Sequence, residues 1–537
     1  MTKSYEQERD AYAAYFPTDI EDTDTISSAS QKEELRTTPL VSLDAKHCAE
    51  IAHAETFFPQ YALLGRSVGD HDLIKSAEPI LLNTNAPNST FICGSQGSGK
   101  FYTLTCMLES CLRTDQDLGR LVKPLTSVVF HYDRNGVSAV AEAASLCSAG
   151  VKVRVLVSRS HYSKLLPSYR AVPGATSENM EVLPLLFQDP HLEADRILKL
   201  MALSTSDNAL PLYMDVLLRI LRETALNGKQ LTLVGLENQL NQESFAPSQR
   251  SMLGMRMGLL KSFCVSSAKQ ALLEEQAKVL GIANKDQVAR QQPPIPEQDV
   301  FTLEPGTLTI IDLTDPFVDA STACVLFDLC LSIITSGKHL NGNGGLVIAL
   351  DEAHKFLNKT PAAEAFTEQI LTTIRMQRHC AARVIVATQE PTISERLLDL
   401  CSVSIVHRFT SPAWFTAIEG HLGGASALTS SPEEQKAMFE RILSLPVGES
   451  LVFSPASYLC VDDGEPKKLG SGVMRMRTRM RKGRDAGRSL LSVRCDEGSG
   501  SVLPVRQSES VGKSPEEDDL SRSAQDSLAR DCRGSEK

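Results

Sequence analysis

Residues 94–100 read Gly-Ser-Gln-Gly-Ser-Gly-Lys, and Phe101 follows them. This is the pattern G-x-x-x-x-G-K, in which backbone amides surround phosphate oxygens and the lysine reaches the outer phosphates. An apolar run, residues 89–93, precedes the pattern, and apolar residues recur after it at helical spacing. Strand, glycine-rich turn and helix form a phosphate site; the alternative is a plain Gly/Ser-rich surface turn. We expect phosphate contacts from Gly94, Ser95, Gln96, Gly97, Ser98, Gly99, Lys100 and Phe101.

The eighth position of the motif normally carries Ser or Thr, whose hydroxyl helps to hold Mg²⁺ on the nucleotide. Phe101 stands there instead. Tyr102 and Thr103 are poor substitutes, because one or two helical positions turn a side chain to another face. We therefore expect ATP and Mg²⁺ as cofactors, with nucleotide binding retained and hydrolysis slow or absent.

The bulk composition indicates an ordinary globular protein. The chain has 537 residues, of which 42% are hydrophobic and 23% charged, and no stretch approaches the ~20 apolar residues of a membrane span. The N-terminal residues are polar and acidic, unlike a secretory signal. Thirteen scattered cysteines suggest reduced thiols in a cytoplasmic or nuclear protein. A net charge of −11 argues against a basic coat for nucleic acid but leaves a local basic channel open.

The order of apolar runs predicts an α/β fold with a mostly parallel sheet, helices on both faces and an all-α insertion. Short Val/Ile/Leu-rich runs are the expected strands: 127–132, 151–157, 308–313, 346–350, 383–387, 403–406 and 450–453. The expected parts are a disordered arm (1–45), a first core segment (46–189), a helical insertion (190–297), a second core segment ending in a basic strand (298–489) and a disordered tail (490–537).

Polar side chains follow two of these strands. The run 346–350 leads directly to Asp351 and Glu352, where Asp351 is the candidate metal ligand and Glu352 the group that polarises a water. The alternative is a solvated acidic turn. Gln389 follows the run 383–387 and can contact the γ-phosphate or the attacking water, or merely begin a loop. Ligands of open α/β sheets bind at this carboxyl edge.

Arg375 and Arg378 are three residues apart, on one helical face. At a subunit edge, such a guanidinium can stabilise charge on the phosphoryl group of a neighbouring subunit. A solvated helix face is the simpler interpretation of this spacing.

Together these motifs resemble the FtsK–HerA class of P-loop ATPases, which have a RecA/FtsK-like fold. The resemblance covers roughly residues 80–455 and rests on the loop, on Leu350-Asp351-Glu352-Ala353-His354-Lys355-Phe356 and on the strand end at 387–391. It implies a hexameric motor that translocates DNA, with an arginine of 375–378 acting in trans. Two departures stand out: Phe101, and a segment before the loop that is too short and polar for the β-barrel of HerA-type proteins. Asp351–His354 also spells the DEAH-box motif, but no second RecA-like domain with its arginines follows.

Residues 474–481 alternate Met or Thr with arginine. As a strand, they would place Arg475, Arg477, Arg479 and Arg481 on one face, where a row of guanidinium groups could hold a DNA backbone. An edge strand protected by charge and a nuclear import signal remain open as alternatives.

The sequence thus favours an ATP-binding protein similar to HerA/FtsK-type DNA translocases, homo-oligomeric and with hydrolysis impaired by Phe101. The alternative is a pseudo-ATPase scaffold, in which bound nucleotide selects the conformation that a protein partner recognises.

Overall fold

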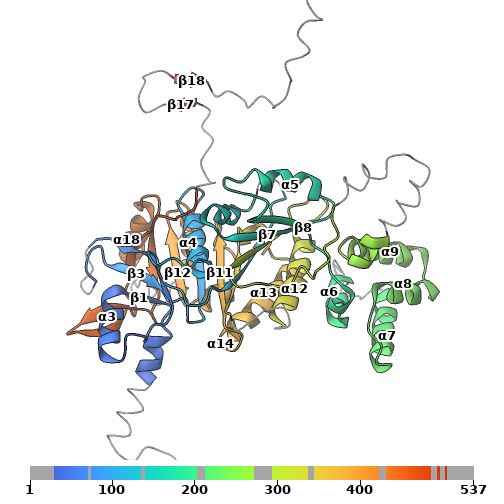
Figure 1. The fold of residues 1–537 in the computed structure, drawn as a ribbon, viewed down its shortest axis with the longest axis horizontal. Helices are drawn as coiled ribbons and strands as arrows, with labels where there is room; N and C mark the ends of the chain where they lie inside the picture. Colours follow the sequence, from blue (N-terminus) through green and yellow to red (C-terminus); the bar gives the residue numbers. More distant parts are fainter. Residues whose placement is uncertain are drawn as a thin grey trace, which may run out of the picture. The chain divides into compact units, whose positions relative to one another are not determined.

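The computed structural model is built on one long sheet, parallel in one part and mainly antiparallel in the other, with helices packed against it (Figure 1). The structure describes residues 30–69, 74–134, 140–201, 212–270, 293–336, 344–421 and 431–484, with two short strands beyond them. Within this part of the chain, no helix combines the length and apolarity that a membrane crossing needs.

Parallel pairing joins the strands in the order β8-β7-β9-β6-β10-β11-β4-β12. Six of the seven expected runs form strands of this parallel set, shifted by no more than one residue at an end, and the run 450–453 lies in the antiparallel part of the sheet. The strands are β4 (Ser89–Cys93), β6 (Thr126–His131), β7 (Lys152–Val157), β8 (Met180–Pro184), β9 (Thr307–Asp312), β10 (Leu346–Leu350), β11 (Ala382–Thr388) and β12 (Val403–His407). Because β11 lies between β4 and β10, the three sequence motifs meet at neighbouring strand ends, which confirms the expected α/β class.

Apolar side chains alternate between two cores on opposite faces of this sheet. Phe91 and Phe130 point into one core, whereas Ile92 and Val129 point into the other. Helices α12 (Ala320–Thr335) and α13 (Pro361–Arg375) cover the first face. Helix α4 (Lys100–Leu112), the 3₁₀ helix η1 (Glu142–Ala149) and α5 (Tyr162–Arg170) cover the second. Strands buried on both faces need apolar residues at every position, which explains their unbroken runs.

The sheet continues past β12 with further strands, of which the sequence predicted only the run 450–453 and the basic strand at 474–481. Pairing there is mainly antiparallel, in the order β12-β13-β16-β2-β3-β1-β14-β15. These strands are β1 (Leu40–Ser42), β2 (Tyr61–Ser67), β3 (Pro79–Leu82), β13 (Glu449–Phe453), β14 (Tyr458–Asp462), β15 (Glu465–Lys468) and β16 (Met474–Thr478), and β5 (Gly119–Arg120) pairs with β2. Helix α3 (Leu43–Ala52) packs against this extension.

Two expected boundaries differ from the structure. The disordered arm was expected to reach residue 45, yet Val41 is fully buried in β1 and pairs with β3 and β14. The N-terminal part of the expected arm, residues 1–29, lies outside the described residues. In the tail, which forms a separate unit from Gly487 onward, strands β17 (Val493–Cys495) and β18 (Val502–Pro504) pair antiparallel.

The expected all-α insertion is present between β8 and β9. It contains α6 (Ala194–Met201), α7 (Leu212–Leu226), α8 (Leu233–Gln242) and α9 (Pro247–Ser262), drawn in green in Figure 1. Helix α6 attaches the insertion to α12, because Lys199 Nζ lies 3.0 Å from the buried Asp328 carboxylate and Arg196 Nε donates to Ser332 Oγ over 3.0 Å. Smaller helices complete the second half of the chain: α14 (Gln377–Cys380), α15 (Glu395–Asp399), α16 (Pro412–Glu419) and α18 (Pro432–Leu443).

Candidate nucleotide-binding site

The glycine-rich loop connects β4 directly to the first turn of α4. Gly99 is the N-cap of α4 with φ 109°, a left-handed conformation that glycine adopts without strain. At Gly94, an added Cβ would lie 2.6 Å from His407 Cβ, so only glycine fits. No side chain caps α4, whereas α12, α13 and α16 are capped by Asp319, Thr360 and Ser411. The first amides of α4 are therefore available to an anion.

Lys100 is buried at the start of α4 and faces the motif on β10. Its Nζ lies 3.4 Å from Glu352 Oε1 and 3.8 Å from the centroid of the Phe101 ring. Burial lowers the pKa of Lys100, and the Glu352 charge opposes that shift. A buried ammonium with one carboxylate and one aromatic face around it can move to phosphate oxygens that offer stronger charge.

Glu352 and Gln389 touch each other at neighbouring strand ends. Gln389 Nε2 donates to Glu352 Oε1 over 2.8 Å, and His354 Nδ1 lies 3.3 Å from Glu352 Oε2. Glu352 has φ 50°, a left-handed conformation that costs a non-glycine residue about 1–3 kcal/mol. Such backbone strain often occurs at functional sites, where it holds a side chain in the orientation that the site requires. The expected grouping of Lys100, Glu352 and Gln389 is thus present.

Asp351 points toward a residue that sequence reasoning missed, His131 at the end of β6. His131 Nδ1 lies 3.0 Å from Asp351 Oδ2, and both side chains are buried. Burial lowers the pKa of His131, but the hydrogen bond to Asp351 and the charges of Asp312 and Asp351 outweigh it and raise the pKa to about 9. The other oxygen, Asp351 Oδ1, is buried without a hydrogen-bond partner. The sequence signal that could have identified His131 is its position as a polar residue at the end of β6, the strand next to β10.

Hydroxyl groups around the loop are already bonded within the protein. Thr103 Oγ1 lies 3.0 Å from His407 Nε2 and 2.9 Å from Thr478 Oγ1. Within the loop, Ser98 Oγ donates to Ser95 O over 2.7 Å, and Ser95 Oγ donates to Arg408 O over 2.9 Å.

A magnesium site requires oxygen ligands in octahedral geometry, usually one or two carboxylates with water and phosphate oxygens. Phe101 offers none, His131 occupies one oxygen of Asp351, and the described residues contain no cluster of three metal-ligating side chains. Two buried carboxylate oxygens of the described site, Asp351 Oδ1 and Glu352 Oε2, have no hydrogen-bond partner. They could hold Mg²⁺ together with water and phosphate oxygens, so the magnesium site stays a prediction.

Arg375 and Arg378 do not approach the loop. Arg375 ends α13, and Arg378 lies in α14, immediately before β11 begins at Ala382. Strand β11 is parallel to β4, so its beginning lies at the amino edge of the sheet, opposite the loop. Both arginines are exposed. They can serve a nucleotide site only on another subunit.

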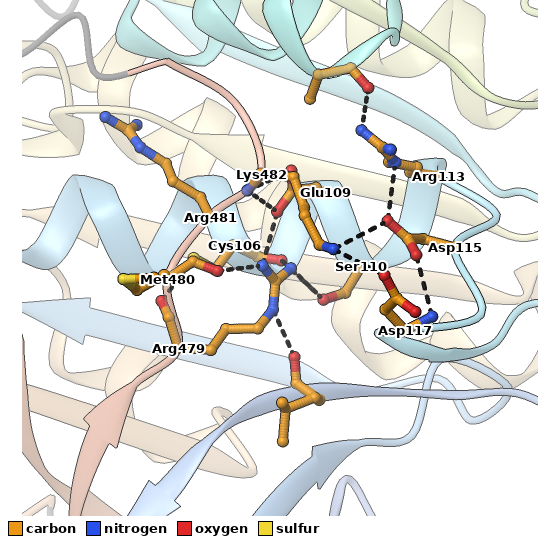
Figure 2. A network of polar contacts seen from close by, with 12 residues as sticks. Cys106, Glu109, Ser110, Arg113, Asp115, Asp117, Arg479, Met480, Arg481 and Lys482 are labelled. Carbon is orange, nitrogen blue, oxygen red and sulfur yellow. Dashed lines mark hydrogen bonds and ion pairs between the residues drawn. The ribbon is translucent and has the colours of Figure 1, made fainter.

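The row of arginines at the end of the core is interrupted. Strand β16 lies between β13 and β2, so it is not an edge strand. Arg475 binds Glu449, with Nη2 2.6 Å from Oε2, and Arg477 Nη1 lies 3.9 Å from the other oxygen. The alternation ends at Thr478, and Arg479 turns inward to Glu109 of α4 (Figure 2). The expected DNA-binding face of four arginines is therefore wrong.

Arg408 is a second residue that sequence reasoning missed. It follows β12, and its carbonyl oxygen accepts hydrogen bonds from Ser95 N and Ser95 Oγ, both over 2.9 Å. Its side chain is half-buried and has no carboxylate within 4.0 Å among the described residues.

Strand order and loop together define a P-loop nucleotide-binding fold, with one strand between the loop strand and the strand that carries the carboxylates. No protein-family model matches the chain, and no curated protein matches its sequence.

Solved structures with a partly similar architecture include VirB4 of Thermoanaerobacter pseudethanolicus, 12% identical over 79% of this chain and 97% of that one, with a TM-score of 0.46. The bacterial conjugative coupling protein TrwBdeltaN70 is 9% identical over 80% of this chain and 94% of that one, at 0.41. The plasmid coupling protein TrwB in complex with ADP and Mg²⁺ is 10% identical over 80% and 95%, at 0.40. Because all three scores are below 0.5, the fold assignment rests on the strand order and loop of this chain.

Proposed function

We propose that this protein binds ATP at the loop of residues 94–100 and hydrolyses it slowly or not at all. The observation that carries the proposal is the group formed by the uncapped start of α4, buried Lys100, Glu352 and Gln389. Amides and Lys100 would hold the β- and γ-phosphates, which are anionic ligands of the kind that helix N-termini and lysines bind. Glu352 would then lose its contact with Lys100 and remain hydrogen-bonded to Gln389.

Slow turnover follows from the same group. Glu352 can act as a general base only when its carboxylate is free to accept a proton from a water near the γ-phosphate. In the structure, Lys100 and Gln389 both contact Glu352 Oε1, which leaves Oε2, without a hydrogen-bond partner, as the oxygen that could accept a proton. Phe101 brings a benzyl group to the position where a hydroxyl would face the phosphates. Both features favour long-lived binding of ATP over its hydrolysis.

Calorimetric titration of the full chain with ATP tests the binding. We expect Lys100→Ala to weaken ATP binding at least about tenfold, since it removes the one lysine at the phosphates. Glu352→Gln should bind as tightly as the natural protein. A natural protein with no measurable heat of ATP binding, or a Lys100→Ala variant with unchanged affinity, would contradict the proposal. Rapid turnover that Glu352→Gln abolishes would contradict slow hydrolysis alone.

The pseudo-ATPase scaffold is the second candidate, favoured by the contacts of Lys100 with Phe101 and Glu352. In this case, bound nucleotide separates Lys100 from Glu352 and thereby selects one arrangement of β10 and α4. Protection of α4 from hydrogen exchange by ATP without turnover would support it. Turnover at a rate typical of motor ATPases would exclude it.

Assembly into a ring is a further part of the proposal. Arg375 and Arg378 are exposed at the edge opposite the loop, which suits contact with the nucleotide of a neighbouring subunit. We do not propose DNA translocation through the row of arginines, because these side chains do not share one exposed face. The row comprises Arg475, Arg477, Arg479 and Arg481.

A further inference from the structure

The ends of β9, β6 and β10 carry a row of buried polar side chains: Asp312, His131 and Asp351. His131 pairs with Asp312 in the register of β6 and β9, and Asp351 N donates to Phe130 O over 2.9 Å, which continues the pairing of β10 with β6. The row lies on the face that α4 covers, because the residues two positions earlier on each strand belong to the core on that side.

The two carboxylates beside His131 differ in how many of their oxygens are bonded. Asp312 Oδ1 accepts from Thr314 N over 2.8 Å, and Asp312 Oδ2 accepts from Tyr169 OH over 2.6 Å. Asp351 Oδ2 is bonded to His131 Nδ1 at 3.0 Å, whereas Asp351 Oδ1 is buried without a hydrogen-bond partner in the described part of the chain. Since a buried polar atom is costly to leave without a partner, Asp351 Oδ1 is the oxygen of this row that suits a ligand.

The hydrogen bond between His131 and Asp351 has a defined direction. An ionised carboxylate accepts but cannot donate, so Nδ1 of His131 carries the hydrogen. This bond holds Asp351 Oδ2 and thereby orients Oδ1. Glu352 Oε2, on the next residue, is the other buried carboxylate oxygen of the described site without a hydrogen-bond partner. Two such oxygens at one strand end suit a divalent cation that water and phosphate oxygens complete.

The loop makes the orientation of Asp351 more important than usual. In P-loop proteins, a loop hydroxyl and a carboxylate at a strand end hold the cation together. This chain has Phe101 at the position of the hydroxyl, and the Thr103 hydroxyl is bonded to His407 and Thr478. Asp351 must therefore hold the cation without that hydroxyl. Donors that bind a ligating carboxylate in this way strengthen metal binding in other proteins.

We propose that His131 is a positioning residue for the divalent cation that accompanies the bound nucleotide. Its Nδ1–H holds Asp351 Oδ2, so that Asp351 Oδ1 is left to bind the cation. The proposal rests on nucleotide binding at the loop of residues 94–100, and it adds a residue that lies outside the sequence motifs. His131 acts through Asp351 and needs no contact with the nucleotide.

Two amide variants test the role of Nδ1, because they share one chemistry and differ in where the donor lies. The amide nitrogen of Asn takes the position of Nδ1, and that of Gln takes the position of Nε2. Calorimetric titration of each full-length protein with ATP, in excess Mg²⁺ and in EDTA, gives a ratio of two affinities, the magnesium ratio. We expect a ratio of about ten or more for the natural protein and His131→Asn. His131→Gln should bring it below about three, with the affinity in EDTA unchanged.

His161→Gln is the matched control, because His161 is another buried histidine and precedes α5 at the end of a different strand connection. This variant should keep the natural magnesium ratio. The role of His131 would be overturned by a natural ratio in His131→Gln, by a lost ratio in His131→Asn, or by the same loss in His161→Gln. A natural protein with equal affinity in both buffers would also overturn it while leaving nucleotide binding intact.

Absence of ATP binding in both buffers would instead overturn nucleotide binding itself. Thermal midpoints establish whether each variant is folded. If His131→Gln is not, His131→Leu takes its place with the same expectation, because leucine also lacks a donor at the position of Nδ1.

Discussion

At the scale of single residues, His407 connects the loop to the sheet beneath it. Its Nδ1 lies 3.0 Å from Glu449 O, its Nε2 lies 3.0 Å from Thr103 Oγ1, and its Cβ approaches Gly94 so closely that no side chain fits there. These contacts on both sides of the ring suit a neutral imidazole. Burial lowers the pKa of His407 to about 4, and the nearby charge of Lys100 acts in the same direction.

This shift predicts an acid sensitivity of the fold. The pKa of a histidine in the unfolded chain is about 6.5, so the contribution of His407 is complete above that pH and is lost as the pH falls toward 4. Between pH 7 and pH 5, the free energy of unfolding should fall by about 2 kcal/mol through this residue. Urea unfolding of His407→Gln should show a smaller loss over that range. His379→Gln, at an exposed position, should keep the natural pH dependence; an unchanged profile for His407→Gln would contradict the prediction.

At the scale of elements, the segment that follows β16 runs along the P-loop helix. Arg479 forms a buried ion pair with Glu109, and Arg479 Nη2 also donates to Cys106 O and Ser110 Oγ, each over 3.2 Å (Figure 2). Nearer the start of α4, Arg481 N donates to Tyr102 OH over 2.8 Å. The segment after β16 thereby holds α4 in place, and α4 begins with Lys100.

The Arg479–Glu109 pair predicts a strong coupling between these two elements. Removal of one partner leaves a buried charge and typically costs about 3–5 kcal/mol, so Arg479→Met and Glu109→Gln should each destabilise the protein by that order. The double variant should lose clearly less than the two single losses together. Chemical unfolding midpoints of the four proteins measure this.

A control variant at a more exposed ion pair separates the effect of the buried pair from that of surface charge in general. Lys482→Met removes the ion pair with exposed Asp117 and the longer one, at 3.9 Å, with Asp115, and should cost about 1 kcal/mol or less because the lysine is exposed. Additive losses in the Arg479 and Glu109 variants would show that the two side chains do not stabilise the fold as a pair.

At the scale of the whole molecule, the sheet separates the two groups of expected catalytic residues. Lys100, Glu352 and Gln389 meet at its carboxyl edge, whereas Arg375 and Arg378 are exposed at the amino edge. One subunit therefore cannot bring both groups to one nucleotide. A ring of subunits can, because it repeats a contact between two different edges of the molecule.

This separation predicts nucleotide-dependent assembly. Light scattering in the presence of ATP should give a multiple of the 58.6 kDa chain mass, with six copies expected, and a smaller mass without nucleotide. The double variant Arg375→Ala/Arg378→Ala should bind ATP but assemble less, since its own site is intact. Lys100→Ala should lose both properties. A chain that remains a monomer with bound ATP would exclude action of these arginines in trans.

Much of the site follows from local pattern. A glycine-rich turn between an apolar run and a helical period specifies the loop, because few residue types allow the backbone to approach a phosphate. Asp351, Glu352 and Gln389 were found for a similar reason: each follows an unbroken apolar run, and parallel strands end at one edge. His131 and Arg408 also follow strands, but their relevance depends on which strands are neighbours.

The arginine row shows where local pattern fails. Alternation in residues 474–481 predicts one face for four arginines, and this holds only while the strand continues. Strand β16 ends at Thr478, so Arg479 turns toward the core and finds Glu109, a residue 370 positions away in the chain. The N-terminal strand β1 was missed in the same way, because besides β3 it pairs with β14, a segment distant in sequence.

By itself, the sequence determined the phosphate loop, the α/β class, the helical insertion and the two polar residues, Glu352 and Gln389, that meet beside Lys100. Periodicity and glycine placement act over a few residues, so they can be recognised without the rest of the chain. Only the tertiary structure decided which charges are already paired: His131 with Asp351, Glu109 with Arg479, and Glu449 with Arg475. Ion pairs form between groups that become neighbours only in the folded chain. A buried charge needs a partner, and the packing of distant strands determines which partner lies close enough.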